Sequence, residues 1–340
     1  MRFIKRNKII ILALSMMLLI ISGCGSSSPD NNAKKEPVDI NVYVPEGLPA
    51  ITMAKLMKDK PEIAAGYNVT YTVKKTSDSL VAKVLNEEAD IAVVPSTLPA
   101  QAANKGLDYK LAATAGWGSL YVISSEDIKD LASVKGKEIY TIGKGLTPDV
   151  VLRYVLSQNS VDPDKDVTLT YLNGATELAP AFISGKAKVA VVPEPMLSQI
   201  LSKKPETKIV ASLNDQWKEK QSSNYGYPQS SLIIKGKVAK EHKAFVDSFL
   251  KEYEKSIAFA NEKPEELGQY SEDLGLTLSK ALAPKVMERA NINYVAIDKS
   301  KDDYSKYYDV IMKFAPKSIG GKIPDEGLYL SLIHIWRCRR

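Results

Sequence analysis

Two short apolar runs, each ending in a proline, constrain most strongly what this chain can fold into. The runs DIAVVP and KVAVVP end at Pro95 and Pro193, and a helical pattern and a short polar turn precede each of them. Apolar runs of this length are typical of strands that are buried in a parallel sheet between helices. The repeat therefore predicts two similar α/β lobes, although ordinary α/β sequence also produces such a match by chance.

Strand and helix patterns alternate over most of the chain, which supports the α/β interpretation. We expect strands at residues 39–44, 67–75, 90–95, 109–116, 119–125, 138–143, 167–174, 188–193, 207–213 and 227–235. We expect helices between them at residues 50–57, 76–86, 178–183 and 196–201, and another after Thr147. Beyond residue 235 the apolar residues follow helical spacing, and residues 264–313 are expected to be mostly helical.

Residues 1–23 are typical of a secretory signal peptide. Four basic residues precede an apolar run that is shorter than the roughly 20 residues of a membrane span. The motif ISGC that follows is similar to a bacterial lipobox, which predicts cleavage before Cys24 and attachment of lipid to this residue. A buried structural cysteine is the alternative. Residues 24–37 are small and polar, as expected for a flexible tether.

The last residues, 330–340, differ in composition from everything before them. Their sequence, LSLIHIWRCRR, resembles a translated sequencing adapter, and we expect this segment to be non-native. A genuine basic tail is the alternative. Fold and function are therefore considered without it.

Charge and cysteine content exclude several classes of function. The formal net charge is +6, but the signal segment holds four basic residues and the C-terminal segment three, so the remaining body is close to neutral. A neutral body gives no electrostatic footprint for nucleic acid. Apart from Cys24 and Cys338 the chain has no cysteine, which excludes disulfides, thiolate catalysis and cysteine metal sites from the body.

Motifs of enzymes and cofactors are not evident in this sequence. His242 is the only histidine before the C-terminal segment, and it stands in a lysine-rich helical pattern with no partner acid or nucleophile in an evident motif. The stretch GKGLTP matches neither the dinucleotide fingerprint nor the P-loop. We therefore expect a protein that is not an enzyme and uses no metal or cofactor.

Polar residues at the predicted strand ends are the candidate ligand contacts, because ligands of open α/β sheets bind beyond the carboxyl ends of the strands. Ser96 and Thr97 follow the first proline corner, and Thr147 and Thr176 stand at the starts of expected helices. Helix N-termini offer unpaired N–H donors to anions or polar groups. Alternatively, Thr147 and Thr176 only cap their helices.

Two carboxylates, Glu46 and Glu194, each follow an apolar strand through a proline. If both face one cleft, they are suited to bind an amine or an amidine-like ring edge. An exposed loop position is the alternative for each. Among the aromatic residues, Trp117 lies between two glycines, where its ring can stack on a ligand, and Tyr227 and Gln229 follow in the stretch NYGYPQSS. Ordinary packing is the alternative for these aromatic rings.

Several motifs, taken in their order, resemble those of a known family. They are YVPEGLPA, DIAVVPSTLPA, GWGSLYVISS, GKGLTPD, NGATELAP, VAVVPEPMLS, YPQSSLIIK and SIGGKIPDE, together with the lipobox. Over about residues 38–329 the chain is similar to ABC-transporter substrate-binding lipoproteins of the nitrate/sulfonate/taurine group, which also includes binders of thiamine-pyrimidine precursors.

This resemblance implies a type II periplasmic-binding-protein fold, in which two crossover strands join two α/β lobes around a ligand cleft. Lobe 1 would comprise residues 38–117 and 231–329, and lobe 2 residues 118–230. Trp117 and Tyr227 would then lie beside the crossovers, and Leu48 of YVPEGLPA joins the candidate ligand contacts. The resemblance also implies a monomer that is lipid-anchored on the extracytoplasmic side of the membrane and delivers a small molecule to an ABC permease and its ATPase subunits.

The ligand is left open between a small anion, such as nitrate or a sulfonate, and a pyrimidine or amine. No arginine stands at a candidate corner, and Glu46 together with Glu194 would repel an anion, which favours the second class. Two other functions remain as alternatives. One is an enzyme on the same fold, as in the menaquinone pathway, and the other is a sensory surface lipoprotein that does not transport.

Overall fold

The computed structural model describes residues 36–75 and 77–331, without the side chains of residues 77, 78, 175 and 176. The expected signal peptide, the lipidation site Cys24 and residues 332–340 lie outside the described residues. Leu330, expected to begin the non-native segment, packs against the core, and its N–H donates to the carbonyl of Leu111 at 2.9 Å.

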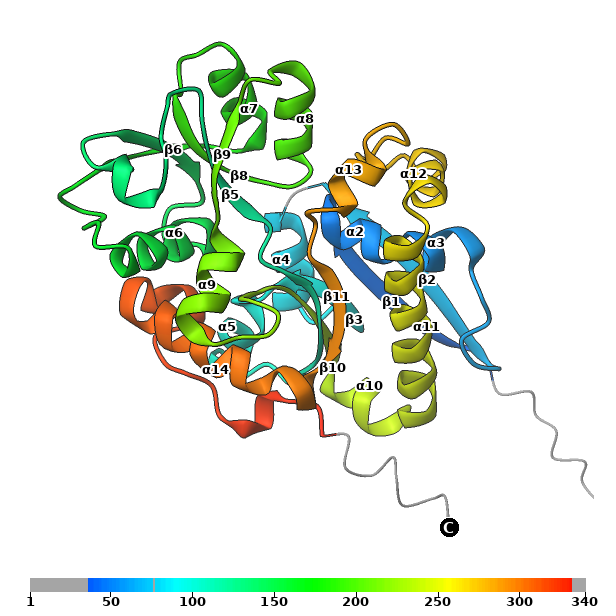
Figure 1. The fold of residues 1–340 in the computed structure, drawn as a ribbon. Coiled ribbons are helices and arrows are strands. Elements are labelled where there is room, and N and C mark those ends of the chain that lie inside the picture. Colours follow the sequence, from blue (N-terminus) through cyan, green and yellow to red (C-terminus); the bar gives the residue numbers. More distant parts are fainter. Residues whose placement is uncertain (1–35, 76, 332–340) are drawn as a thin grey trace, which may run out of the picture. The chain divides into compact units, whose positions relative to one another are not determined.

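The described strands form two mixed sheets (Figure 1). The six-stranded sheet has the order β11 (Ile292–Ala296), β4 (Tyr109–Trp117), β10 (Pro228–Lys235), β3 (Ile91–Pro95), β1 (Val38–Pro45) and β2 (Tyr67–Lys74). The five-stranded sheet has the order β7 (Thr168–Leu172), β6 (Glu138–Ile142), β8 (Val189–Pro193), β5 (Leu120–Ser124) and β9 (Lys208–Ser212).

The two sheets repeat one topology, as the paired apolar runs predicted. β3 and β8 hold equivalent positions: each pairs in parallel with β1 or β6 and antiparallel with β10 or β5. The expectation of parallel sheets is corrected, because both central strands have one antiparallel neighbour. An apolar run reports burial on both faces, and it carries no information about the direction of the neighbouring strand.

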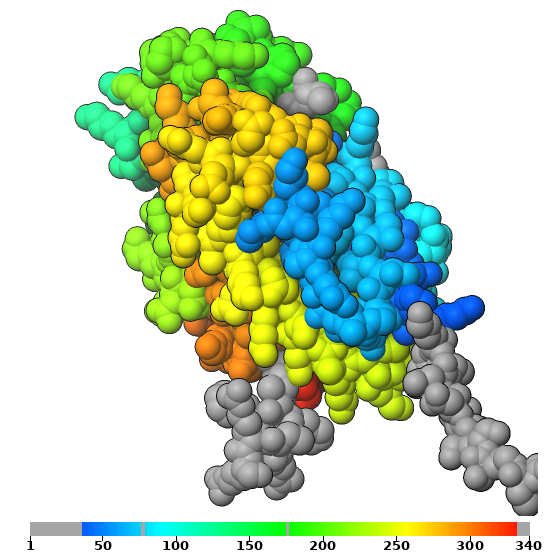
Figure 2. All heavy atoms as spheres, turned by 90° about the vertical axis from the view of Figure 1, so that its right-hand side faces the viewer, coloured from blue at the N-terminus to red at the C-terminus, as the bar shows by residue number. Residues whose placement is uncertain are grey.

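Helices cover both faces of each sheet. On one face of the six-stranded sheet lie α2 (Leu48–Thr52), α3 (Ala54–Asp59), α10 (Gly236–Glu241), α11 (Lys243–Glu262), α12 (Pro264–Asp273) and α13 (Ala283–Met287). On its other face lie α4 (Ser77–Leu85), α5 (Leu98–Asn104) and α14 (Ile297–Phe314). Figure 2 shows the first of these faces, where the yellow atoms of α11 and α12 lie against the blue atoms of the segment that contains α3.

The five-stranded sheet is covered by α6 (Thr147–Gln158) and α9 (Leu213–Gln221) on one face and by α7 (Ala175–Ile183) and α8 (Met196–Lys203) on the other. Short 3₁₀ turns lie at Leu131–Val134, Pro316–Ile319 and Glu326–Leu328. We use lobe 1 for the six-stranded sheet with α2 to α5 and α10 to α14, and lobe 2 for the five-stranded sheet with α6 to α9.

Helix α14 joins the cores of the two lobes. Tyr304, Tyr307, Tyr308 and Ile311 recur at helical spacing and are fully buried, so this face of the helix packs into the core. The helix packs on β4, β10 and β11 of lobe 1 and on α6 of lobe 2. One cluster of buried apolar side chains therefore runs without interruption from lobe 1 into lobe 2.

Two segments of the chain cross between the lobes, one at residues 118–119 and one before Pro228. The lobe boundary expected after residue 230 falls inside β10, which pairs with β4 from Pro228 to Lys235 and with β3 from Ser230 to Ile234. Residues 264–313 are mostly helical, as expected, and the strand β11 is an exception within this segment. The strand has five residues, too few for an alternating pattern to stand out between two helices.

Candidate functional site

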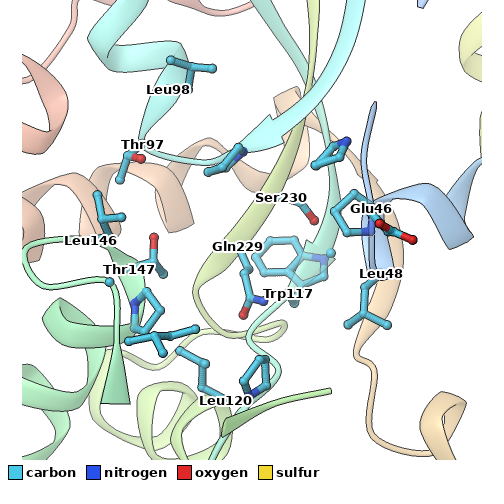
Figure 3. Close-up of a pocket in the computed structure, with 18 of the residues that line it drawn as sticks. Glu46, Leu48, Thr97, Leu98, Trp117, Leu120, Leu146, Thr147, Gln229 and Ser230 are labelled. Atoms are coloured by element: carbon cyan, nitrogen blue, oxygen red, sulfur yellow. The ribbon is translucent and has the colours of Figure 1, made fainter. Parts of the chain in front are cut away.

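A cavity of about 590 Å³ opens between the two lobes (Figure 3). Pro45, Pro95, Ile142 and Pro193 are the last residues of β1, β3, β6 and β8, and all four line the cavity. The cavity therefore lies at the carboxyl ends of strands from both sheets, where open α/β sheets bind their ligands. The two proline corners of the sequence repeat face it from opposite lobes.

Most of the cavity wall is apolar. Its apolar residues, besides the strand ends, are Leu48, Pro49, Val81, Leu98, Trp117, Leu120, Leu146, Pro148, Ala290 and Ile292. Its polar side chains are Glu46, Thr52, Thr97, Gln101, Thr147, Asn173, Gln229, Ser230 and Ser318. Among these described lining residues, none is arginine, lysine or histidine, and Glu46 alone is ionisable. This size and composition are typical of a small-molecule site.

The turn between β6 and α6 brings Thr147 to the cavity wall. Gly143 follows β6 with a φ of +68°, a left-handed conformation that residues with a Cβ rarely adopt. Its carbonyl accepts a hydrogen bond from the N–H of Leu146 at 2.8 Å, and α6 begins at the next residue. Gly143 thus reverses the chain within a few residues, and the first residue of the helix meets the cavity.

Glu46 stands at the cavity with a half-buried side chain. In Figure 3 it lies beyond Trp117, on the side away from Thr97 and Thr147. Among the residues that the structure describes, none forms an ion pair or a side-chain hydrogen bond with this carboxylate. The carboxylate is therefore available to a cation or a hydrogen-bond donor, and its contact with a ligand stays a prediction.

Ser96 and Thr97, either of which was expected to offer a hydroxyl to the ligand, lie on different sides of the cavity wall. Ser96 is fully buried behind it, and its hydroxyl lies 2.7 Å from the hydroxyl of Ser231. Thr97 lines the cavity. Consecutive residues of an irregular turn face different directions, and the turn directs one of the two hydroxyls into the core. Ser96 is corrected from a candidate ligand contact to a core residue.

Glu194 is also corrected, because its carboxylate does not line the cavity. The side chain is 0% exposed and accepts hydrogen bonds from Arg289 Nε at 2.9 Å, from the N–H of Ser198 at 3.1 Å and from the Ser198 hydroxyl at 2.9 Å. Arg289 belongs to lobe 1 and Glu194 to lobe 2. The expected ligand contact is therefore an ion pair between the lobes.

This ion pair changes the electrostatics expected for the cavity. Burial raises the pKa of Glu194 above its ordinary value, while the hydrogen bonds from Arg289 and Ser198 oppose that rise by stabilising the carboxylate. Arg289 also lies directly before Ala290 of the cavity wall. Since Arg289 balances the charge of Glu194, Glu46 is the carboxylate that remains unbalanced at the site.

Trp117 lines the cavity as expected, but its ring is packed rather than free. It is 2% exposed, stacks on Tyr225 with ring centroids 4.9 Å apart, and donates its Nε1–H to the carbonyl of Asn293 at 3.1 Å. Tyr227 does not reach the cavity. It is fully buried against Trp217, with ring centroids 5.5 Å apart, and is corrected to a core residue.

Gln229 lines the cavity, and its amide also ties the two crossovers together. The Ser119 N–H donates to Gln229 Oε1, and Gln229 Nε2 donates to the Ser119 hydroxyl, both at 2.9 Å. Leu48, from α2, contributes to the apolar wall of the cavity, and its contact with a ligand stays a prediction. The side chain of Thr176 lies outside the described part of the chain, so its expected role is not placed.

Several lining residues were not expected from the sequence, among them Thr52, Gln101, Ser230 and Ser318. Ser230 comes from β10, one residue after Gln229, and no pattern distinguishes it from its neighbours. Ile292 belongs to β11, a strand that was not predicted within the mostly helical segment 264–313. A correct strand assignment would have moved this residue to the edge of β4 and hence toward the cavity.

Neither a metal site nor a membrane span is found among the described residues. In residues 36–75 and 77–331 no three His, Cys, Asp or Glu side chains gather as ligands for an ion. No helix in these same ranges is both long enough and apolar enough to cross a bilayer.

Comparison with known proteins agrees with this architecture. A family profile described as NMT1/THI5 like matches residues 64–267. The crystal structure of an ABC transporter from Parabacteroides distasonis is 30% identical, covers 87% of this chain and 99% of that chain, and has a TM-score of 0.76. YtlA of Bacillus subtilis (strain 168), named a binding protein, is 30% identical over 171 residues, which are 48% of this chain. The match covers 49% of YtlA, so the chain spans about half the length of this curated relative.

More distant structures share the fold. The periplasmic aliphatic sulphonate-binding protein SsuA of Escherichia coli is 13% identical, covers 87% of this chain and 93% of that chain, and has a TM-score of 0.72. The periplasmic nitrate-binding protein NrtA of Synechocystis PCC 6803 is 12% identical and has a TM-score of 0.59. The match covers 78% of this chain and 74% of that chain. The two-lobed fold and the family resemblance predicted from the sequence are confirmed.

Proposed function

The chain belongs to the NMT1/THI5-like family, and from this premise we propose that it is the extracytoplasmic solute-binding lipoprotein of an ABC importer. It captures a small molecule between its lobes and delivers it to a membrane permease, whose ATPase subunits supply the energy. In this function the protein binds and releases the molecule and does not change it chemically.

One observation carries this proposal: four strand ends from two lobes of like topology line a single cavity. A ligand held by both lobes stabilises the arrangement in which the lobes are close together, by its higher affinity for that arrangement. A permease that recognises this arrangement then receives loaded protein in preference to empty protein. The names of the relatives, an ABC transporter and a binding protein, support this mechanism.

The cavity favours a neutral or cationic ligand with an apolar body over a simple anion. Its described lining holds one carboxylate, Glu46, and no cationic side chain, so an anion would meet repulsion without a compensating ion pair. Trp117 and the surrounding leucines and prolines provide apolar contact for a ring. We propose an amine- or pyrimidine-like ligand whose donor edge binds Glu46, with nitrate and sulfonates as the competing class.

Ligand-induced thermal stabilisation tests this ligand class. Pyrimidin-4-amine and simple aromatic amines are expected to raise the melting temperature, and nitrate, taurine and methanesulfonate are not. Glu46→Gln should weaken binding of the amines about tenfold, the equivalent of about 1.4 kcal/mol, because the glutamine oxygen still accepts a hydrogen bond but the contribution of the negative charge is lost.

The matched control for this experiment is Glu265→Gln, since Glu265 is exposed on α12 and does not line the cavity. Recovery of unchanged ligand in stoichiometric amount distinguishes binding from turnover. The proposed ligand class would be wrong if nitrate or taurine bound tightly and Glu46→Gln left that binding unchanged.

Lipid anchoring at Cys24 is the second part of the proposal, and it rests on the lipobox-like motif. A diacylated cysteine anchors a protein more firmly than one acyl chain does. Metabolic labelling with an alkynyl palmitate should mark the wild-type protein and leave Cys24→Ala unlabelled. Equal labelling of both proteins would refute the anchor.

A further inference from the structure

Two hydroxyl groups meet where α14 of lobe 1 contacts the start of α6 in lobe 2. The Oγ1 atom of Thr147 lies 2.7 Å from the phenol oxygen of Tyr307, a normal distance for a hydrogen bond between hydroxyls. Thr147 lines the cavity, whereas Tyr307 is fully buried in the core behind it. The pair therefore connects the cavity wall of one lobe to the interior of the other.

Counting the hydroxyl protons leaves two possible arrangements. Each hydroxyl carries one hydrogen, and one hydrogen bond between the two groups uses one of them. Among the described residues, neither hydroxyl has a second hydrogen-bond partner. Either Tyr307 donates and the Thr147 hydrogen remains, or Thr147 donates and the Tyr307 hydrogen remains.

Burial decides between these arrangements. A buried donor without an acceptor is destabilising because it has lost its hydrogen bond to water, and Tyr307 is 0% exposed. Thr147 is 8% exposed and borders the cavity, so its hydrogen can reach a ligand or water there. Burial also raises the pKa of Tyr307, so the phenol keeps its proton at neutral pH. The arrangement in which Tyr307 donates leaves no buried donor unsatisfied.

We propose that Tyr307 is a positioning residue of the binding site. Its phenol donates to Thr147 Oγ1 and thereby directs the Thr147 hydroxyl hydrogen into the cavity, so this wall selects a ligand with a hydrogen-bond acceptor. The selection step rests on the proposed function, since it requires that the cavity bind a small molecule, whereas the direction of the proton does not. The site then has a donor at Thr147 and an acceptor at Glu46, on walls from different lobes.

The neighbouring tyrosine on α14 provides a matched control. Tyr308 is equally buried, and its phenol donates to the backbone carbonyl of Ser96 at 3.1 Å. Tyr308→Phe therefore removes a buried phenol from the same helix without a change at Thr147. A purely structural role for these phenols predicts similar effects of Tyr307→Phe and Tyr308→Phe on every measurement.

Infrared spectroscopy of the full chain with isotope-labelled tyrosine tests the proton direction without any ligand. The band that disappears in Tyr307→Phe belongs to Tyr307. A phenol that donates has a higher C–O stretching frequency than a free one, and a phenol that only accepts has a lower one. Thr147→Val should therefore shift the Tyr307 band to lower frequency. A shift to higher frequency, or no shift, overturns the proposal.

Paired ligands test the selection. Pyrimidin-4-amine and aniline have the same shape and the same amino donor, but only the first has ring nitrogen acceptors. Wild type and Thr147→Ser should prefer pyrimidin-4-amine, and Thr147→Val should reduce this preference about tenfold, the equivalent of one hydrogen bond of about 1.4 kcal/mol. Tyr307→Phe should reduce it about threefold, because the freed Thr147 hydroxyl can then turn and accept from a ligand.

The control and the two readouts separate the possible results. Tyr308→Phe should keep the wild-type preference, and an equal loss in Tyr307→Phe and Tyr308→Phe overturns the positioning role. A preference unchanged in Thr147→Val overturns the selection by this wall. If wild type binds neither compound, the ligand class of the proposed function fails, and the direction of the infrared shift still decides how Tyr307 and Thr147 share their protons.

Discussion

Glu46 and Glu194 follow the same kind of strand end, yet they occupy different environments. The Glu194 carboxylate is enclosed between the lobes by Arg289 and Ser198, whereas Glu46 borders the cavity without a charged partner among the described residues. A buried carboxylate needs compensation for its lost hydration, and Arg289 provides it. The residues next to a glutamate in the sequence therefore do not reveal whether a cation lies beside its carboxylate in the folded protein.

At the same scale, we predict that the Glu194–Arg289 ion pair contributes to stability. Glu194→Gln should lower the free energy of unfolding by about 2 kcal/mol, less than the 3–5 kcal/mol of a fully buried pair because Arg289 is 25% exposed. Urea unfolding followed by circular dichroism measures the change.

Glu288→Gln is the matched control for this pair. Glu288 lies 3.6 Å from the same arginine, but its side chain is 68% exposed, so its removal should change the free energy of unfolding by less than about 0.5 kcal/mol. Equal effects of the two substitutions would contradict the assignment of the buried pair.

At the scale of elements, the crossover after β4 depends on a residue without a side chain. The Gly118 N–H donates to the carbonyl of Tyr227 at 3.0 Å, and the Gly118 carbonyl accepts from Asn291 Nδ2 at 2.6 Å. A Cβ at this position would overlap the ring of Tyr227 and the side chain of Asn214. The two crossovers can lie this close together only because one of them has glycine at the contact.

Gly118→Ala should therefore destabilise the protein by more than about 2 kcal/mol, because Tyr227 and Asn214 have to move inside a packed core. Gly174→Ala is the comparison, since a Cβ there would meet no atom within 4 Å. That substitution should cost less, about 0.5–1 kcal/mol in the free energy of unfolding, because Gly174 is the N-cap of α7 and alanine is a poorer cap than glycine. Similar melting temperatures for the two variants would refute the close-approach argument.

At the scale of the whole molecule, the described residues from Pro37 onward behave as one compact unit with two sheets. The core cluster that contains Val94 of β3 also contains Val191 of β8, and α14 packs on both lobes. A continuous core couples the unfolding of the two lobes. If one lobe unfolds, the buried apolar side chains of the other lobe that pack against it become exposed to water.

We therefore predict that the two lobes unfold together. Hydrogen exchange measured by mass spectrometry should give amides of β3 and β8 opening free energies that agree within about 1 kcal/mol. The antiparallel edge strand β11, which has one neighbouring strand, is expected to open more easily. A difference of several kcal/mol between β3 and β8 would show that the lobes unfold independently.

The sequence by itself determined the α/β class, most of the strands and helices, and the pairing of the two proline corners. The order of apolar residues depends directly on the periodicity and burial of each strand or helix. DIAVVP and KVAVVP therefore predicted buried strands without any structure. The same apolar pattern predicted that Thr97 and Thr147 follow the ends of strands, and both residues line the cavity.

Only the tertiary structure decided which polar groups face the cavity. Ser96 and Tyr227 point into the core, Glu194 binds Arg289 from the other lobe, and Thr147 bonds to Tyr307. The physical reason is that a side chain's direction at a turn, and its partner across a lobe boundary, depend on residues far away in the chain. A pattern of apolar residues records how deeply a segment is buried, and the hydrogen-bond partner of each polar group is fixed when the lobes pack together.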